Sequence, residues 1–146
     1  MVRNIGIIEG NRSASDNDWE TVKKGGEEGI KRWIKEQIKY RSCTVVLVGS
    51  NTANRKWINY EISESWNAGM GVVGIHIYGL KDKDGYISNK GENPFEYVSV
   101  GRDGISLSSV VKCYTPAGTN STERYDWISR YISDAVEEAI KIRNNY

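Results

Sequence analysis

The stretch Thr44-Val45-Val46-Leu47-Val48-Gly49 decides the fold class, because it is a short, continuously apolar run rich in β-branched residues. A run of this kind predicts a strand buried on both faces, as in parallel sheets. A helical pattern follows over 54–68, and 71–80 has the apolar pattern of a second strand. Strand, helix and strand within about forty residues form a βαβ unit with a right-handed crossover. We therefore predict an α/β protein with a mostly parallel sheet flanked by helices.

The flanking segments extend this pattern in both directions. Apolar residues at spacings of three and four predict helices over 19–40 and 125–143. A further strand is expected over 109–114, and residues 4–9 fit either a short strand or a helix-to-strand connection. The charged, glycine-rich segment 81–104 reads as a long loop, and long loops in compact domains are usually functional or disordered.

Composition limits the classes of protein that this chain can belong to. With 146 residues the chain predicts one domain over 1–146. Its 20 basic and 19 acidic residues give a net charge of +1, which argues against a nucleic-acid partner held by phosphate neutralisation. The longest uncharged stretch, 65–80, is too short to span a membrane, and no secretory signal is visible. We therefore expect a cytoplasmic protein with no membrane partner and with reduced cysteines.

Motifs for metal and triphosphate chemistry are missing from the sequence. His76 is the only histidine and lies in an apolar strand pattern, so packing at or near the strand end is the default interpretation. The segment Asp82-Lys83-Asp84-Gly85 does not have the ligand pattern of a calcium loop. We predict no metal site.

The segment 48–62 carries the most chemical information. The predicted strand ends at the small polar residues Ser50, Asn51 and Thr52, and the following helix carries Trp57 and, one turn later, Glu61. Ligands of open α/β sheets bind outside the carboxyl ends of the strands, which is where this loop is expected. No basic residue stands four positions after Glu61, so an intrahelical ion pair does not explain it. From spacing alone a solvated surface carboxylate is the default interpretation, and a functional carboxylate is the alternative.

The same segment carries a family resemblance. Trp57-Ile58-Asn59-Tyr60-Glu61 resembles the W-x-x-x-E signature of TIR domains, in which the glutamate is the NAD-cleaving residue. The block 41–62 is similar, more narrowly, to bacterial TIR-like proteins of the Thoeris anti-phage system. The matching residues are Ser42, Thr44, Val46 to Ser50, Asn54, Arg55, Lys56, Trp57, Ile58, Tyr60, Glu61 and Ile62. Weaker similarity reaches upstream to 19–20 and downstream to 125–127, so that most of the chain is covered.

The resemblance implies a flavodoxin-like, TIR-like fold and an enzyme that cleaves the nicotinamide–ribose N-glycosidic bond of NAD+. Glu61 would be the catalytic residue, NAD+ the substrate, and no further cofactor or metal would be needed. Trp57 would either wall the site or belong to the core. The other substrate contacts that the resemblance suggests are Ser50, Asn51 and Thr52 after the strand, and Arg12 and Trp19 near the first helix.

The Thoeris resemblance also implies partners. The product would be a cyclic ADP-ribose-type signal that activates a separate defence effector, with a phage-derived trigger and a homo-oligomer as expected features. Independently of the resemblance, the length and the glycines of the segment 81–104 suggest a lid over the cleft. Two other functions stay open, namely a non-catalytic TIR-like interaction module and a flavodoxin-like nucleotide binder.

One departure from the family concerns the beginning of the chain. Family members begin with a short apolar strand in the middle of the sheet, whereas this chain starts at Met1-Val2-Arg3-Asn4, which resembles the stretch after that strand. We therefore expect a sheet without the usual first central strand, and lower stability or activity than in a version extended upstream.

Overall fold

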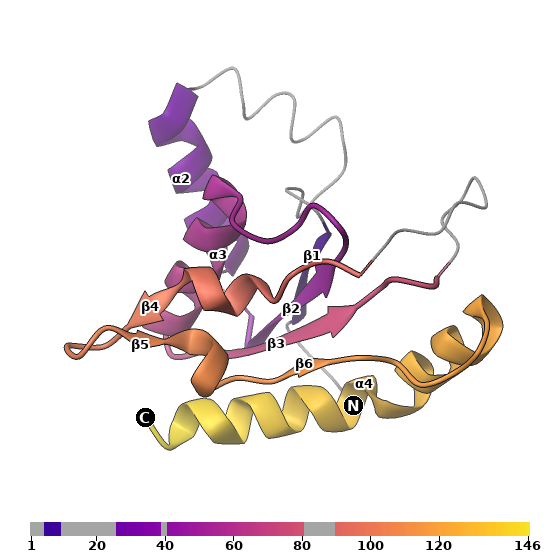
Figure 1. Cartoon of the computed structure of the whole chain (residues 1–146). Coiled ribbons are helices and arrows are strands. Elements are labelled where there is room, and N and C mark those ends of the chain that lie inside the picture. The colour runs from indigo at the N-terminus through magenta and orange to yellow at the C-terminus, as the bar shows by residue number, and fades with distance from the viewer. Residues whose placement is uncertain (1–4, 10–25, 39–40, 81–89) are drawn as a thin grey trace.

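The computed structural model describes residues 5–9, 26–38, 41–80 and 90–146. Four strands form one parallel sheet in the order β1-β2-β3-β6 (Figure 1). The strands are β1 (Ile5–Glu9), β2 (Cys43–Val48), β3 (Gly71–His76) and β6 (Cys113–Tyr114), and the helices are α2 (Gly26–Ile38), α3 (Lys56–Asn67) and α4 (Ser121–Asn144). The prediction of a parallel sheet flanked by helices is confirmed.

Strand β2 lies inside the sheet and is buried on both faces, as its continuous apolar run predicts. It pairs with β1 from Ile5 opposite Cys43 and with β3 from Cys43 opposite Gly71, so both of its edges are hydrogen-bonded. Residues 5–9 are thus a strand rather than a connection. On one face, Val46 and Val48 belong to the core under α3, whereas on the other Cys43 and Val45 belong to the core under α4.

The two elements after β2 are shorter than predicted, for local reasons. Helix α3 begins at Lys56 instead of residue 54, because Asn54 has a left-handed backbone with φ 59°, which asparagine tolerates. Strand β3 ends at His76 instead of residue 80, because the chain turns there and the Leu80 N–H donates to the Ile77 carbonyl. Of the helix predicted over 19–40, residues 19–25 and 39–40 lie outside the described part.

The loop predicted over 81–104 is interrupted by short regular elements in its described part, 90–104. This part contains the 3-10 helix η1 (Pro94–Tyr97) and, with the residues that follow, the short antiparallel pair β4 (Ser99–Val100) and β5 (Ile105–Ser106). Phe95 is fully buried in the core under α3. A segment anchored in this way cannot serve as the predicted lid, and residues 81–89 lie outside the described part.

The strand predicted over 109–114 is likewise reduced to β6. A second 3-10 turn, η2 (Leu107–Ser109), precedes it, and the N–H groups of Val110 and Val111 both donate to the Leu107 carbonyl. This turn satisfies the backbone groups that a longer strand would have placed in the sheet.

Helix α4 covers the opposite face of the sheet from α3 (Figure 1). It begins at Ser121, four residues earlier than predicted, because the Asn120 side chain caps it by accepting the Glu123 N–H at 2.9 Å. A Cβ atom at Gly71 would lie 2.8 Å from the backbone of Ala139, so α4 rests directly on the start of β3. None of the described helices has a segment both long and apolar enough to cross a bilayer.

Candidate functional site

Glu61 lies on the inward face of α3 and is only 3% exposed. It stands three residues after Ile58 and directly before Ile62, and both of these side chains are buried in the core between α3 and the sheet. The default interpretation of a solvated surface carboxylate is therefore wrong. The spacing from Ile58 and to Ser65 already places Glu61 within the inward stripe of the helix.

The partner of Glu61 is Arg41, which lies two residues before β2. Its Nη1 donates to Glu61 Oε1 at 2.6 Å, and the two side chains are 8% and 4% exposed. No other hydrogen bond to this carboxylate is formed within the described part of the chain. Sequence reasoning missed Arg41 because it is twenty positions from Glu61 and only the tertiary fold brings them together.

Two opposing effects act on the Glu61 carboxyl. Burial raises its pKa and is the larger effect, whereas the hydrogen bond and the positive charge of Arg41 lower it. A buried carboxyl whose pKa is set by desolvation and one specific charge is a typical functional-site candidate, although structural ion pairs produce the same pattern.

A contact between two buried hydroxyls, those of Thr44 and Ser65, joins α3 to β2 near Glu61. Ser65, one turn further along α3, lies with its Oγ 2.8 Å from Thr44 Oγ1 at the start of β2. This contact joins α3 to the beginning of β2, and the pair of Arg41 and Glu61 joins α3 to the residues just before β2.

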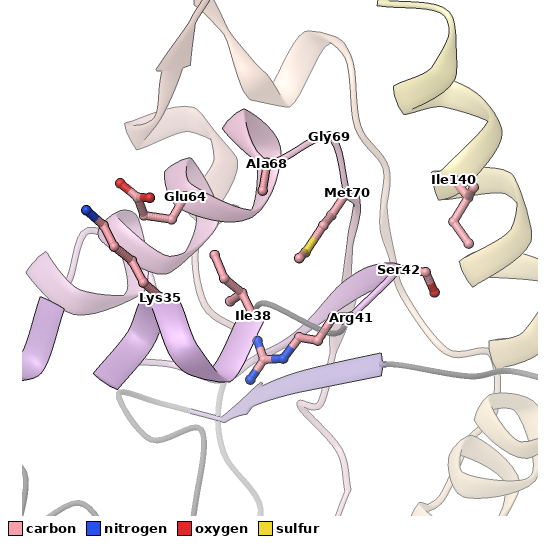
Figure 2. A pocket seen from close by; sticks show the side chains of 9 residues that line it. All are labelled: Lys35, Ile38, Arg41, Ser42, Glu64, Ala68, Gly69, Met70 and Ile140. Carbon is pink, nitrogen blue, oxygen red and sulfur yellow. The ribbon is translucent and has the colours of Figure 1, made fainter. Parts of the chain in front are cut away.

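Arg41 of this ion pair also lines a cavity of about 530 Å³, whose lining side chains are shown in Figure 2. The cavity lies between the carboxyl-terminal ends of α2 and α3 and the residues that precede β2 and β3. Its lining residues are Lys35, Ile38, Arg41, Ser42, Glu64, Ala68, Gly69, Met70 and Ile140. Arg41 therefore lines the cavity and contacts Glu61, whereas Glu61 is not among the lining residues. This cavity is at the amino ends of the strands, whereas we predicted a site at their carboxyl ends.

The predicted ligand-contact residues after β2 form a separate turn. Ser50 and Asn51 are exposed there, and Thr52 is buried. The Thr52 hydroxyl accepts the Gly49 N–H at 2.8 Å and donates to the Leu47 carbonyl at 3.5 Å, so it holds the turn together. A six-residue strand such as β2 spans about 20 Å. The structure therefore does not bring this turn together with the ion pair at the other end of β2.

Trp57 bridges α3 and α2. It is partly buried with Tyr60 against Ile30 and Ile34, and its ring meets the Tyr60 ring edge-on at 5.7 Å. This position agrees better with Trp57 as part of the packing between α2 and α3 than with Trp57 as a side chain that lines a substrate site. Arg12 and Trp19 lie outside the described residues.

Two other reactive side chains of the described chain, His76 and Cys43, are buried. His76, the last residue of β3, is 5% exposed, and burial lowers its pKa, which agrees with strand-end packing. Burial raises the pKa of the Cys43 thiol to about 12, so this thiol stays protonated and unreactive. Among the described residues, no group of three or more His, Cys, Asp or Glu side chains could hold a metal ion.

A parallel sheet with helices on both faces, and a buried glutamate that ends a W-x-x-x-E segment on the helix after β2, define a TIR-like α/β domain. Comparison with known proteins specifies the class further. The chain belongs to the family of the TIR-like domain of Thoeris protein ThsB, whose family model matches residues 1–82.

One relative carries a functional name. Over 102 residues the chain is 42% identical to a protein of Bacillus cereus (strain MSX-D12) named "Putative cyclic ADP-D-ribose synthase ThsB1". The matched part makes up 67% of this chain and 53% of that protein. The chain thus spans about half the length of the curated relative that it matches.

Proposed function

We propose that this TIR-like domain processes NAD+ by cleaving the bond between nicotinamide and ribose, with Glu61 as the catalytic residue. The observation that carries the proposal is the burial of the Glu61 carboxylate, of which one oxygen accepts a hydrogen bond from Arg41. The name of the Bacillus relative, "Putative cyclic ADP-D-ribose synthase ThsB1", supports chemistry at an ADP-ribosyl group.

The reaction asks little of the protein besides a negative charge. Nicotinamide is cationic in NAD+, so the breaking N-glycosidic bond returns its electron pair to the ring nitrogen and releases a neutral molecule. The ribose is left as an oxocarbenium ion, which a nearby carboxylate stabilises. At about 4 Å and an effective dielectric constant of about 20, such a charge pair contributes roughly 4 kcal/mol. That energy corresponds to roughly a thousandfold in rate.

The group that attacks the oxocarbenium ion determines the product. Attack by water gives linear ADP-ribose, whereas attack by a group of the ADP-ribosyl unit itself closes a ring. A carboxylate with a side chain that is 4% exposed lies in a region where little water competes, which favours ring closure. In this proposal the product is a cyclic ADP-ribose-type signal, which acts on a separate effector in defence against phage after a phage-derived trigger.

The test is product analysis of the purified protein incubated with NAD+, by chromatography with mass detection. We expect release of nicotinamide together with a cyclic or linear ADP-ribose. Glu61→Gln keeps the size of the side chain but removes its charge, and should lower turnover about a thousandfold. Glu36→Gln, an exposed carboxylate on α2 that does not line the cavity, is the control and should keep its activity. Equal turnover in wild type and Glu61→Gln would remove Glu61 from the mechanism.

A non-catalytic interaction module is the second candidate. The ion pair with Arg41 already compensates the Glu61 charge without any substrate, and this observation favours the module. Such a module needs no turnover, so NAD+ left intact both by this chain and by a version extended upstream, with a phage-derived trigger present, would support it.

A further inference from the structure

Arg41 is the residue that connects Glu61 with the rest of the candidate site. It donates a hydrogen bond to the carboxylate and also lines the cavity. We propose that Arg41 is a positioning residue for the cleavage reaction: by binding one oxygen of Glu61 it holds the buried carboxylate in place and keeps it ionised. This inference rests on the proposed function and adds a residue to it.

Burial is the reason why Glu61 needs such a partner. A carboxyl group this deep in a protein neutralises itself by taking up a proton unless a charge or hydrogen bonds compensate it. The burial of Glu61 raises its pKa, and Arg41 acts in the opposite direction through both its hydrogen bond and its charge. Without Arg41 the carboxyl would stay protonated to higher pH, and a neutral acid cannot stabilise an oxocarbenium ion.

No other charged group of the described chain takes this role. From α2, Lys31 lies over the Tyr60 ring at 5.9 Å, and Lys35 lines the cavity. Figure 2 shows Lys35 and Glu64 together on one side of the cavity, away from Arg41.

Strand β2 itself carries no charged side chain, and its Thr44 hydroxyl is bonded to Ser65 of α3. On α3, Lys56 is paired instead with Glu27 of α2.

Stability alone does not explain the pair. A buried ion pair is often no more stabilising than apolar side chains of the same volume, because both charges lose their hydration. The chain nevertheless places an arginine and a glutamate from distant segments in contact at 2.6 Å inside its core. A requirement for a charged carboxylate at this position accounts for the arrangement.

The experiment compares wild type with Arg41→Gln, which removes the charge, and Arg41→Lys, which restores it. Turnover of NAD+ is measured across pH, and the Glu61 carboxyl is titrated by carbon-13 NMR. Activity requires the ionised form, so it rises with pH through the Glu61 pKa. Arg41→Gln should lower turnover at pH 7 at least tenfold and move this rise upward by about one pH unit or more. Arg41→Lys should recover much of the turnover at pH 7 and return the activity rise towards its wild-type pH.

A matched control excludes a general effect of changing an arginine that binds α3. Arg143 donates to the Trp66 carbonyl at 2.9 Å and stacks on the Trp66 ring near the end of the same helix. Arg143→Lys should leave the pH profile in place. Arg41→Gln with turnover equal to or above that of wild type, or with an unmoved profile, would overturn the proposal and make Arg41 a restraint or a packing residue.

The titration separates this inference from the proposed function. If wild type does not cleave NAD+, the proposed function fails. The NMR titration then still shows whether Arg41 keeps the Glu61 carboxyl ionised. If Arg41→Gln does not fold, the wild-type titration decides. A Glu61 carboxyl that is protonated at pH 7 in wild type contradicts the inference, and an ionised one agrees with it.

Discussion

The ion pair between Arg41 and Glu61 leads to a prediction about stability that needs no enzymatic activity. Replacing Arg41 by Gln leaves the Glu61 side chain, 4% exposed, without its charged partner. Removing one member of a buried pair typically costs about 3–5 kcal/mol, because the other charge stays desolvated. The carboxyl can limit this cost by binding a proton, which makes the loss of stability depend on pH.

The size of this dependence follows from the ordinary pKa of glutamate, 4.5. If the folded variant keeps Glu61 protonated, the cost of holding that proton is about 3.4 kcal/mol at pH 7 and about 0.8 kcal/mol at pH 5, at 1.36 kcal/mol per pKa unit. These values are upper limits for the difference from wild type, in which burial already raises the pKa of Glu61. Because the folded state holds a proton that the unfolded state releases above about pH 4.5, stability falls as pH rises.

Urea unfolding of wild type, Arg41→Gln, Glu61→Gln and the double variant at both pH values measures the effect. We expect Arg41→Gln to be clearly more destabilising at pH 7 than at pH 5, and the double variant to lose this difference because it has no carboxyl to titrate. The cost of Arg41→Gln should also be smaller when Glu61 is already Gln. Equal destabilisation at both pH values, or costs that simply add in the double variant, would refute the reasoning.

Three further predictions test the frame around the site by thermal or urea unfolding. Phe95→Ala should lower the free energy of unfolding by about 3–5 kcal/mol, because the ring is fully buried. Tyr97→Ala, on the same 3-10 helix but 41% exposed, should lower it much less. Equal losses would contradict the anchoring of this segment by Phe95. Gly91→Ala should destabilise by at least about 1–3 kcal/mol, because its Cβ would lie 2.0 Å from the Gly49 carbonyl oxygen, and an unchanged midpoint would show that the two segments do not touch. Thr52→Val removes the hydroxyl that accepts the Gly49 N–H and should cost about 1–3 kcal/mol; no loss would mean that this turn does not depend on it.

The sequence predicts the elements whose pattern is local. The β-branched run of β2 and the inward residues Ile58 and Ile62 of α3 each lie within one short window, so periodicity finds both elements. Periodicity does not reveal the segment around Phe95, because a single aromatic residue among charged and glycine residues produces no repeat. The anchoring of that segment depends on contacts with distant elements.

The candidate site divides in the same way. The W-x-x-x-E segment directs attention to Glu61, and its position between Ile58 and Ile62 could have revealed that it faces inward. Arg41 could not be assigned, because a contact across twenty positions depends on how α3 lies over β2. The cavity at the amino ends of the strands is equally a product of how the ends of α2 and α3 meet the sheet.

The position of β2 between two cores has a consequence for how the molecule comes apart. Val46 and Val48 are held by the layer that contains α3, and Cys43 and Val45 by the layer that contains α4. If either helical layer detaches, one face of β2 is exposed to water. Because the other layer packs against the same strand, its core is weakened as well. The helix that carries Glu61 and the helix on the far side of the sheet should therefore be lost in a single cooperative transition.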